Sequence, residues 1–470
     1  MSGVPVTNLR RYGPRLVALS LAMLLPSLGT SIANVALPTL ATSFDVTMAE
    51  VQWVVISYLL TLTCLIVGAG RLGDIIGRRR LLLLGIGLFA VASAACALAP
   101  SLLVLIAART VQGLGAAVMM ALTIAMVGDL VPKDRTGSAM GLLGTVSAVG
   151  TALGPSLGGA LIAGFGWPAV FAVMAAMGGI TLVVGRALFP SDATGGQRPV
   201  GFDLIGMALL TLSLFAVAVI LTLGSGLSGS VLAAVAVISI LGVIAFVGHE
   251  ARVPAPFVRL DLLRNRTIGR GLFSMALISA ILMATLVVGP FYLSGVLGLG
   301  SVQTGLVMSV GPGVAALTGA PAGRLIDRLG SDRVGIAGLV AVMIGALLLT
   351  VLPSRFGVSG YVASLIIVTF GYALFQAANT TAIMQATTSD QRGVTSALLG
   401  LSRNLGLIAG ASAMGAVYAM GPRLFEAFGL PSDSETGLQI TFAVATGLAG
   451  LALGSALWGR RGRIPCDATE

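Results

Sequence analysis

Arg109 is the strongest candidate for a functional residue in this 470-residue chain, because its charged side chain lies inside an apolar segment over residues 102–127. A guanidinium in such a segment is costly and usually marks a functional pathway. Gln112 follows three residues later and therefore shares its helix face. We expect the pair to contact a substrate or to couple to an ion; the alternative is an arginine that satisfies the carbonyls of a broken helix. Arg403 lies near the basic end of another apolar segment, where its long side chain can reach water.

A charged string, GAGRLGDIIGRRR (68–80), separates two long apolar runs and recurs 253 residues later as AGRLIDRLGSDR (322–333). Its aspartate can accept hydrogen bonds from a helix N-terminus, its arginines can pair with carboxylates, and its glycines allow close packing and a tight turn. A loop that only sets orientation is the alternative, but it leaves the repeated Gly-x-x-x-Asp-x-x-Gly frame unexplained. We expect a cytoplasmic latch made by Gly70, Arg71, Asp74, Gly77, Arg78, Asp129, Gly323 and Asp327.

Carboxylates are missing from the middle of the apolar segments. All 17 acidic residues fall in loops or near segment ends, although a buried carboxylate with a raised pKa is the natural proton carrier. The three cysteines and the single histidine, His249, have no metal-ligand or cofactor spacing. We expect a cavity that suits neutral or anionic amphipathic compounds better than dications, lined by Asn34, Gln52, Tyr58, Arg109, Gln112, Gln376 and Asn379, with Arg403 as a further candidate.

The composition predicts an integral membrane protein. The chain is 56% hydrophobic and 9% charged, whereas a soluble globular domain carries about 25% charged residues. Its apolar runs are long enough to cross about 30 Å of hydrocarbon as helices. The net charge of +10 does not indicate a nucleic-acid partner, because the basic residues are spread over many loops.

Fourteen apolar segments have the length of about 20 residues that a membrane crossing needs. We expect all-α spans at 15–37, 50–70, 81–99, 102–127, 138–163, 167–188, 203–223, 229–248, 269–290, 303–322, 334–353, 359–384, 394–418 and 438–458.

The loop charges predict how these spans are oriented. Lys and Arg concentrate on the cytoplasmic side of membrane proteins. If the N-terminus is cytoplasmic, the loops on that side hold 23 of the 27 basic residues and the outer loops hold 2. We therefore expect both termini to be cytoplasmic and the first span to be an uncleaved anchor.

The repeated string predicts an internal duplication. Its copies join spans 2 and 3 and spans 10 and 11, so two extra spans must separate two six-span halves. Such a duplication is typical of secondary transporters, whose substrate site lies between the halves near the bilayer midplane. We expect a six-helix bundle in 1–188, two inserted spans in 189–250, a second six-helix bundle in 251–458 and a cytoplasmic tail in 459–470.

Five motifs, in order, carry a resemblance to the major facilitator superfamily. GRLGDIIGRRR (70–80) is similar to its loop 2–3 signature, LIAARTVQGLGAA (105–117) to its span 4 signature and GTALGPSLGG (150–159) to its span 5 antiporter motif. VQWVVISYLL (51–60) and RLDLLRNRTI (259–268) resemble the fourteen-span drug:proton antiporter branch of that family.

The resemblance implies alternating access between two bundles and export of hydrophobic or amphipathic small molecules, driven by inward proton flow. It implies that Gly150, Gly154, Pro155, Gly158 and Gly159 let spans of the two bundles approach closely; ordinary membrane helix packing is the alternative. We expect a monomer in the lipid bilayer of a bacterial inner membrane, with no cofactor, metal or nucleic acid.

One position departs from that branch. The aspartate that it carries five residues before Asn34 is replaced by Gly29, so the resemblance does not identify the proton carrier. An uncoupled facilitator or importer with the same fold is therefore the alternative function. A membrane enzyme or sensor is a third reading, against which the sequence shows no metal cluster, nucleophile–base set or soluble domain.

Overall fold

The computed structural model describes residues 7–130, 136–189, 204–223, 228–253, 265–387, 392–427 and 435–461, which form helices joined by short turns, with no strand among them. The first part of the chain contains α1 (Thr7–Phe44), α2 (Met48–Val51), α3 (Trp53–Ile76), α4 (Arg78–Ala97), α5 (Leu102–Leu130), α6 (Thr136–Phe165) and α7 (Pro168–Leu188). A capping box of Thr47 and Glu50 starts α2.

The remaining helices follow in the order α8 (Leu204–Leu223), α9 (Gly229–Glu250), α11 (Arg266–Phe291), α12 (Ser301–Leu329), α13 (Ser331–Gln385), α14 (Arg392–Ala409), α15 (Gly415–Ala427) and α16 (Thr436–Arg461). Two π-helical turns, Tyr292–Val296 and Gly410–Met414, extend α11 and join α14 to α15. Each of the fourteen expected spans falls on helix in the described residues.

The helices differ in how well they satisfy the requirements of a membrane crossing. Within the described residues, ten are long and apolar enough to cross a membrane, or up to eleven if α12, which bends by 47°, counts as one span. Helices α6 and α8 contain shorter apolar stretches, Val149–Phe165 and Ala208–Ile220. The structure therefore shows an all-helical membrane protein, and the number fourteen stays a prediction.

The 55-residue helix α13 is folded back on itself. Gly357 has φ 56° and ψ −132°, a conformation that is nearly confined to glycine. A Cβ on Gly338 would meet the backbone of Gly371, and a Cβ on Gly345 would meet that of Val368. The two arms therefore lie antiparallel in close contact, and they cover the two separate spans expected at 334–353 and 359–384.

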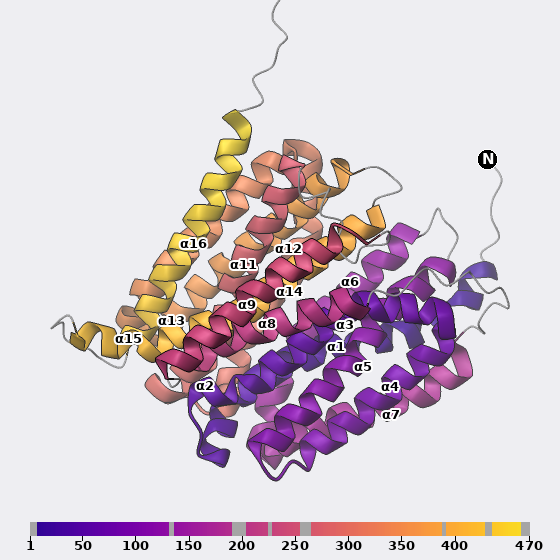
Figure 1. Cartoon of the computed structure of the whole chain (residues 1–470), viewed down its shortest axis with the longest axis horizontal. Helices are drawn as coiled ribbons and strands as arrows, with labels where there is room; N and C mark the ends of the chain where they lie inside the picture. The colour runs from indigo at the N-terminus through magenta and orange to yellow at the C-terminus, as the bar shows by residue number, and fades with distance from the viewer. Residues whose placement is uncertain are drawn as a thin grey trace, which may run out of the picture.

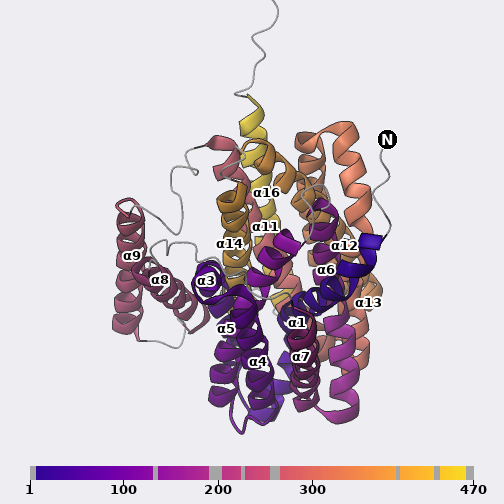
Figure 2. The same ribbon diagram turned by 90° about the vertical axis from the view of Figure 1, so that its right-hand side faces the viewer.

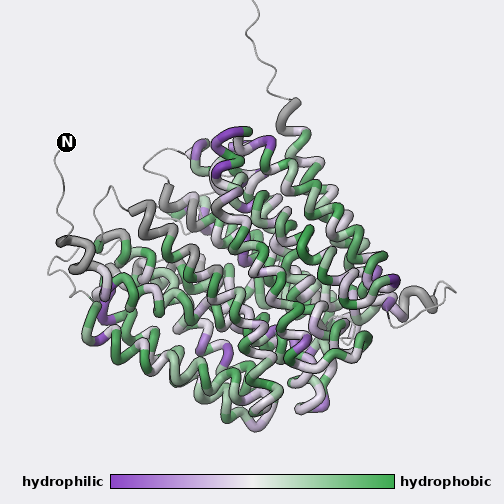
Figure 3. Tube along the Cα trace, turned by 180° about the vertical axis from the view of Figure 1, so that it is seen from behind, coloured by the Kyte–Doolittle hydropathy of each residue, from purple (hydrophilic) through white to green (hydrophobic). Residues whose placement is uncertain are grey.

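Two groups of helices make up the molecule (Figure 1). In the first, α1 packs on α6, α5 packs on α3 and α4, and α4 packs on α7; in the second, α13 packs on α12 and α16, and α11 packs on α14. They meet where α6 contacts α12, α1 contacts α11 and α3 contacts α14. Helices α8 and α9 pack on each other at one edge (Figure 2), where α8 contacts α3. Hydrophobic residues cover most of each helix, with hydrophilic residues more frequent near the ends (Figure 3).

The repeated string folds in the same way in both copies. Gly77 separates α3 from α4 with φ 103° and ψ 128°, and Gly330 separates α12 from α13 with φ 83° and ψ 152°. The Gly77 N–H donates to the Gly73 carbonyl at 3.0 Å, and the Gly330 N–H donates to the Ile326 carbonyl at 2.8 Å. Residues 73 and 326 are also equivalent in the repeat, so the duplication extends to the backbone of the turn.

Gly330→Ala should lower the thermal unfolding midpoint of the purified protein. An L side chain at this φ costs about 1–3 kcal/mol. Gly323→Ala is the matched control, because a Cβ there would have nothing within 4 Å and alanine favours a helix. An unfolding midpoint of Gly330→Ala equal to that of the control would show that the turn tolerates a side chain.

Candidate functional site

The guanidinium of Arg109 is fully buried and is held by three acceptors from three helices. Its Nε donates to the Val54 carbonyl of α3 at 2.9 Å, its Nη1 to Gln112 Oε1 of α5 at 2.6 Å, and its Nη2 to the Gly29 carbonyl of α1 at 3.2 Å. The Tyr58 ring lies 4.1 Å from its Cζ, within the range of a cation–π contact. Arg109 therefore ties α1, α3 and α5 together inside the first group of helices.

Further hydrogen bonds extend this network to α4. The Gln112 Nε2 donates to Ser93 Oγ at 2.6 Å, and Ser93 Oγ donates to the Phe89 carbonyl at 2.6 Å. Tyr58 Oη donates to the Pro26 carbonyl of α1 at 2.9 Å. Two of the three acceptors of Arg109 are backbone carbonyls, which favours the structural alternative for this residue, and its side chain is fully buried.

Position 29 lies directly beside the network. A Cβ on Gly29 would be 3.2 Å from Tyr58 Oη and 3.6 Å from Phe89 Cζ, and the Gly29 carbonyl already accepts from Arg109. A carboxylate at this position would lie next to the guanidinium. Among the side chains that the structure describes, no acidic group contacts Arg109.

The other predicted cavity residues are not joined to Arg109. Asn34 donates to the Thr30 carbonyl at 3.1 Å within α1. Asn379 donates to the Gly271 carbonyl at 3.0 Å and lines a cavity of about 440 Å³ between α11, α13 and α16. Gln376 and Arg403 are half-buried in the second group. The structure thus brings together Arg109, Gln112 and Tyr58, and it places Asn34, Gln376, Asn379 and Arg403 elsewhere.

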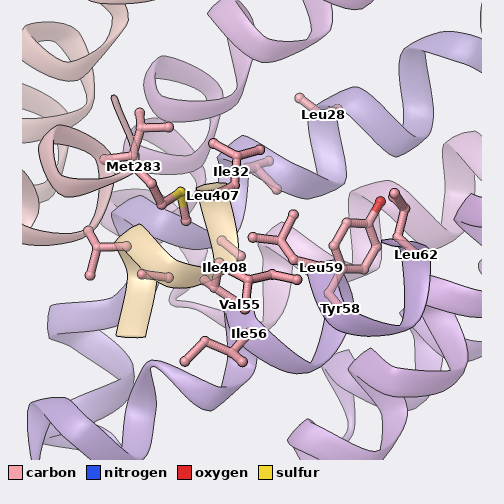
Figure 4. Close-up of a cluster of buried hydrophobic side chains, with 14 of the residues drawn as sticks. Leu28, Ile32, Val55, Ile56, Tyr58, Leu59, Leu62, Met283, Leu407 and Ile408 are labelled. Carbon is pink, nitrogen blue, oxygen red and sulfur yellow. The ribbon is translucent and has the colours of Figure 1, made fainter. Parts of the chain in front are cut away.

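An apolar cluster fills the place where the two groups of helices meet (Figure 4). Its side chains come from both groups, are all buried and gather in one region: Leu28 and Ile32 of α1, Val55, Ile56 and Leu59 of α3, Met283 of α11, and Leu407 and Ile408 of α14. Sequence reasoning did not select them, because each resembles any other apolar residue of a span.

The glycine motif of α6 faces two helices. A Cβ on Gly150 would be 2.9 Å from the Leu24 carbonyl, and Gly154 and Gly158 face Ser31 and Ile32, so all three lie against α1. On another face, Gly159 lies against the Ser301 carbonyl of α12. Gly305 of α12 lies against the Pro155 carbonyl of α6. The motif therefore packs α6 on α1 within one group and on α12 of the other.

Gln52 makes a further contact between the two groups. It lies at the junction of α2 and α3, is 1% exposed and packs against Gly415, where a Cβ would collide with its amide. Neither its Nε2 nor its Oε1 has a hydrogen-bond partner among the described residues. The glycine gives this amide the space that it occupies.

The structure describes only some side chains of the predicted latch. The side chains of Arg71, Asp74 and Asp129 lie outside the described residues, and Asp327 is exposed. A Cβ on Gly70 or Gly323 would have nothing within 4 Å. Among the described residues, no neighbour packs closely on Gly70, whereas Gly77 lies at a tight turn and Arg78 begins α4.

Two groups of membrane helices with a repeated turn, in contact through glycines and an apolar cluster, are typical of a multi-pass membrane transporter. A family model for the Major Facilitator Superfamily matches residues 19–411, and the chain belongs to this family.

Several proteins similar to this chain are bacterial transport or drug-resistance proteins. The chain is 27% identical to "Riboflavin transporter RibZ" of Clostridioides difficile (strain 630), over 86% of this chain and 88% of that protein. It is 30% identical to "Multidrug resistance protein Stp" of Mycobacterium tuberculosis (strain ATCC 25618 / H37Rv), over 86% of this chain and 75% of that protein. A crystal structure of the peptide transporter POT in complex with sulfate has the same fold, with a TM-score of 0.72, 16% identity and coverage of 95% of both chains.

Arg109→Lys should destabilise the protein although it keeps the charge. The ammonium of lysine cannot donate in the same three directions as a planar guanidinium, so at least one of the three hydrogen bonds is lost. Each hydrogen bond of this charged group contributes about 1.5–3 kcal/mol. The measurement is the thermal unfolding midpoint in detergent, with Arg328→Lys on the exposed end of α12 as the control. If Arg109→Lys unfolds at the wild-type temperature, the three acceptors do not require a guanidinium.

Proposed function

We propose that this protein is an exporter of hydrophobic or amphipathic small molecules that works by alternating access and proton antiport. The observation that carries the proposal is the contact of α6 with both α1 and α12 through the glycine motif. Glycine faces give a close contact without interlocked side chains, so one group of helices can rock against the other. The kinship with a multidrug resistance protein supports export.

The proposed topology has fourteen spans with both termini in the cytoplasm of a bacterium, as the charge asymmetry favours. The first bundle is 1–188, the inserted spans are 189–250, the second bundle is 251–458 and the tail is 459–470. The antiparallel arms of α13 support counting two spans in that helix. The protein acts as a monomer in the inner membrane.

The proposed substrates are neutral or anionic amphiphiles. The cluster between the two groups is apolar, so a compound that passes between them meets hydrocarbon side chains. The charge of Arg109 lies behind this cluster within the first bundle and repels a cation that comes near it. No acid among the described side chains offsets that repulsion.

A second function rests on a specific observation. No carboxylate among the described side chains lies in the middle of a span, and the chain is also similar to a riboflavin transporter. Uncoupled or inward movement of a small metabolite is therefore the competing proposal. In the exporter, Asp74 stays the proposed latch carboxylate.

Export is tested by a drug-susceptibility panel on an efflux-deficient bacterial host, followed by inside-out vesicles with a compound from that panel. We expect accumulation that needs the proton gradient and is lost in Gly159→Ala, because the added methyl group pushes α12 from α6 at a cost of about 1–3 kcal/mol. Gly164→Ala, on the same helix with nothing within 4 Å, is the control. Accumulation that persists without the gradient would favour the facilitator.

Gly29→Asp should widen the substrate range toward cations. At about 8 Å and an effective dielectric constant near 20, Arg109 disfavours a monovalent cation by about 2 kcal/mol, roughly thirtyfold, and a divalent cation by more. A carboxylate at position 29 pairs with the guanidinium and removes this penalty. Resistance to a monovalent and a divalent cationic dye is compared in the wild type, Gly29→Asp and Gly29→Asn.

The asparagine variant has the same size as the aspartate variant and separates charge from crowding against Tyr58. Strong export of both dyes by the wild type, unchanged in Gly29→Asp, would refute the charge argument.

A further inference from the structure

A groove of about 750 Å³ runs between α4 and α7, away from the contact between the two bundles. One end is lined by Arg79 and Arg80 of α4 and by Arg186 of α7. Beyond these arginines the lining is apolar and includes Leu84 and Val91. The groove thus combines a cluster of positive charge with a hydrocarbon wall.

The packing of the two helices explains the groove. A Cβ on Gly178 of α7 would be 2.9 Å from the Ala90 Cβ of α4, so the helices touch at that level. Towards the basic end, the floor of the groove is Gly87, which has no side chain. A Cβ on Gly87 would be 3.8 Å from Leu182 Cδ2 of α7. At the end itself, Arg79 Nη2 donates to the Arg186 carbonyl at 2.8 Å and bridges the helices.

The groove faces the outside of the molecule. Helices α4 and α7 lie at its periphery (Figures 1 and 2). The exposed fractions are 59% for Leu84 and 69% for Val91 on α4, and 60% for Ile180 and 69% for Val183 on α7. In a membrane these side chains contact lipid, so the natural occupant of the groove has an acyl chain.

The turn after Gly77 does not depend on Arg78 or Arg79, because the second copy has Ser331 and Asp332 in their places and the turn at Gly330 matches that at Gly77. Arg333 stands where the first copy has Arg80. No acidic residue is among the described residues that line the α4–α7 groove. Arg79, Arg80 and Arg186 together place positive charge at one end of the groove, which suits an anionic ligand.

We propose that the groove binds one anionic phospholipid of the leaflet at its basic end, which is the cytoplasmic leaflet in the proposed topology. Arg80 and Arg186 contact the phosphate, Arg79 holds the two helices together, and an acyl chain lies over Gly87 between Leu84 and Val91. Basic pockets between membrane helices bind anionic headgroups, and each arginine near the headgroup region contributes about fivefold in affinity.

Native mass spectrometry of the full-length protein in detergent tests this site, with dioleoyl phosphatidylglycerol as the probe and the phosphatidylcholine of the same acyl chains as the neutral comparison. We expect tighter binding of phosphatidylglycerol and a loss of about 25-fold in Arg80→Gln/Arg186→Gln. The control Arg328→Gln/Arg333→Gln removes the same charge from exposed arginines of the second bundle and should stay within twofold of the wild type.

Gly87→Leu tests the apolar part at unchanged charge. The leucine fills the floor of the groove and should also abolish the preference for phosphatidylglycerol. Glycerol phosphate, which lacks acyl chains, should not compete. Wild-type affinity in the double arginine variant, equal binding of the two lipids, or competition by glycerol phosphate would each overturn the site. If the double variant does not purify as a monodisperse protein, Gly87→Leu and the two-lipid comparison decide the matter.

Discussion

Arg109 holds a positive charge at a depth where water does not reach it, and such a charge needs acceptors around it. The protein supplies them from the carbonyls of Val54 and Gly29 and from Gln112. Because the guanidinium is planar, these acceptors must lie around it at fixed positions, and α1, α3 and α5 are held accordingly. The position of α1 in turn fixes the surface on which the glycine face of α6 packs. The arrangement of the first bundle thus follows from satisfying one charge.

The second constraint is that helices in lipid gain no hydrophobic free energy by meeting each other. Close packing must supply the attraction, and glycines make it available at Gly154 against α1 and at Gly159 against α12. The arms of α13 use the same device at Gly338 and Gly345. The chain therefore uses the same residue type for contacts within each group of helices and for the contact between the two groups.

The sequence correctly predicted the features that depend on residues close together along the chain. The repeated string predicted a tight turn, and the structure has a glycine with positive φ in both copies; the spacing of Arg109 and Gln112 predicted a shared face, and they form a hydrogen bond of 2.6 Å. The sequence did not predict the features that depend on contacts between residues far apart along the chain. Asn379 was assigned to a common cavity with Arg109 but bonds to Gly271, since a single sequence gives the face of a residue and not its partner.

Gln52 has a consequence for the reversibility of the contact between the halves. Among the described residues, this buried amide has no hydrogen-bond partner, and a buried amide without a partner raises the free energy of that state by about 1–3 kcal/mol. Separation of Gln52 from Gly415 would return the amide to water and recover this amount, offsetting part of the apolar and glycine contacts that are broken. The joined and parted arrangements are thereby brought closer in free energy. The proposed alternating access needs two conformations of similar free energy, and in this proposal the Gln52 side chain contributes to that similarity.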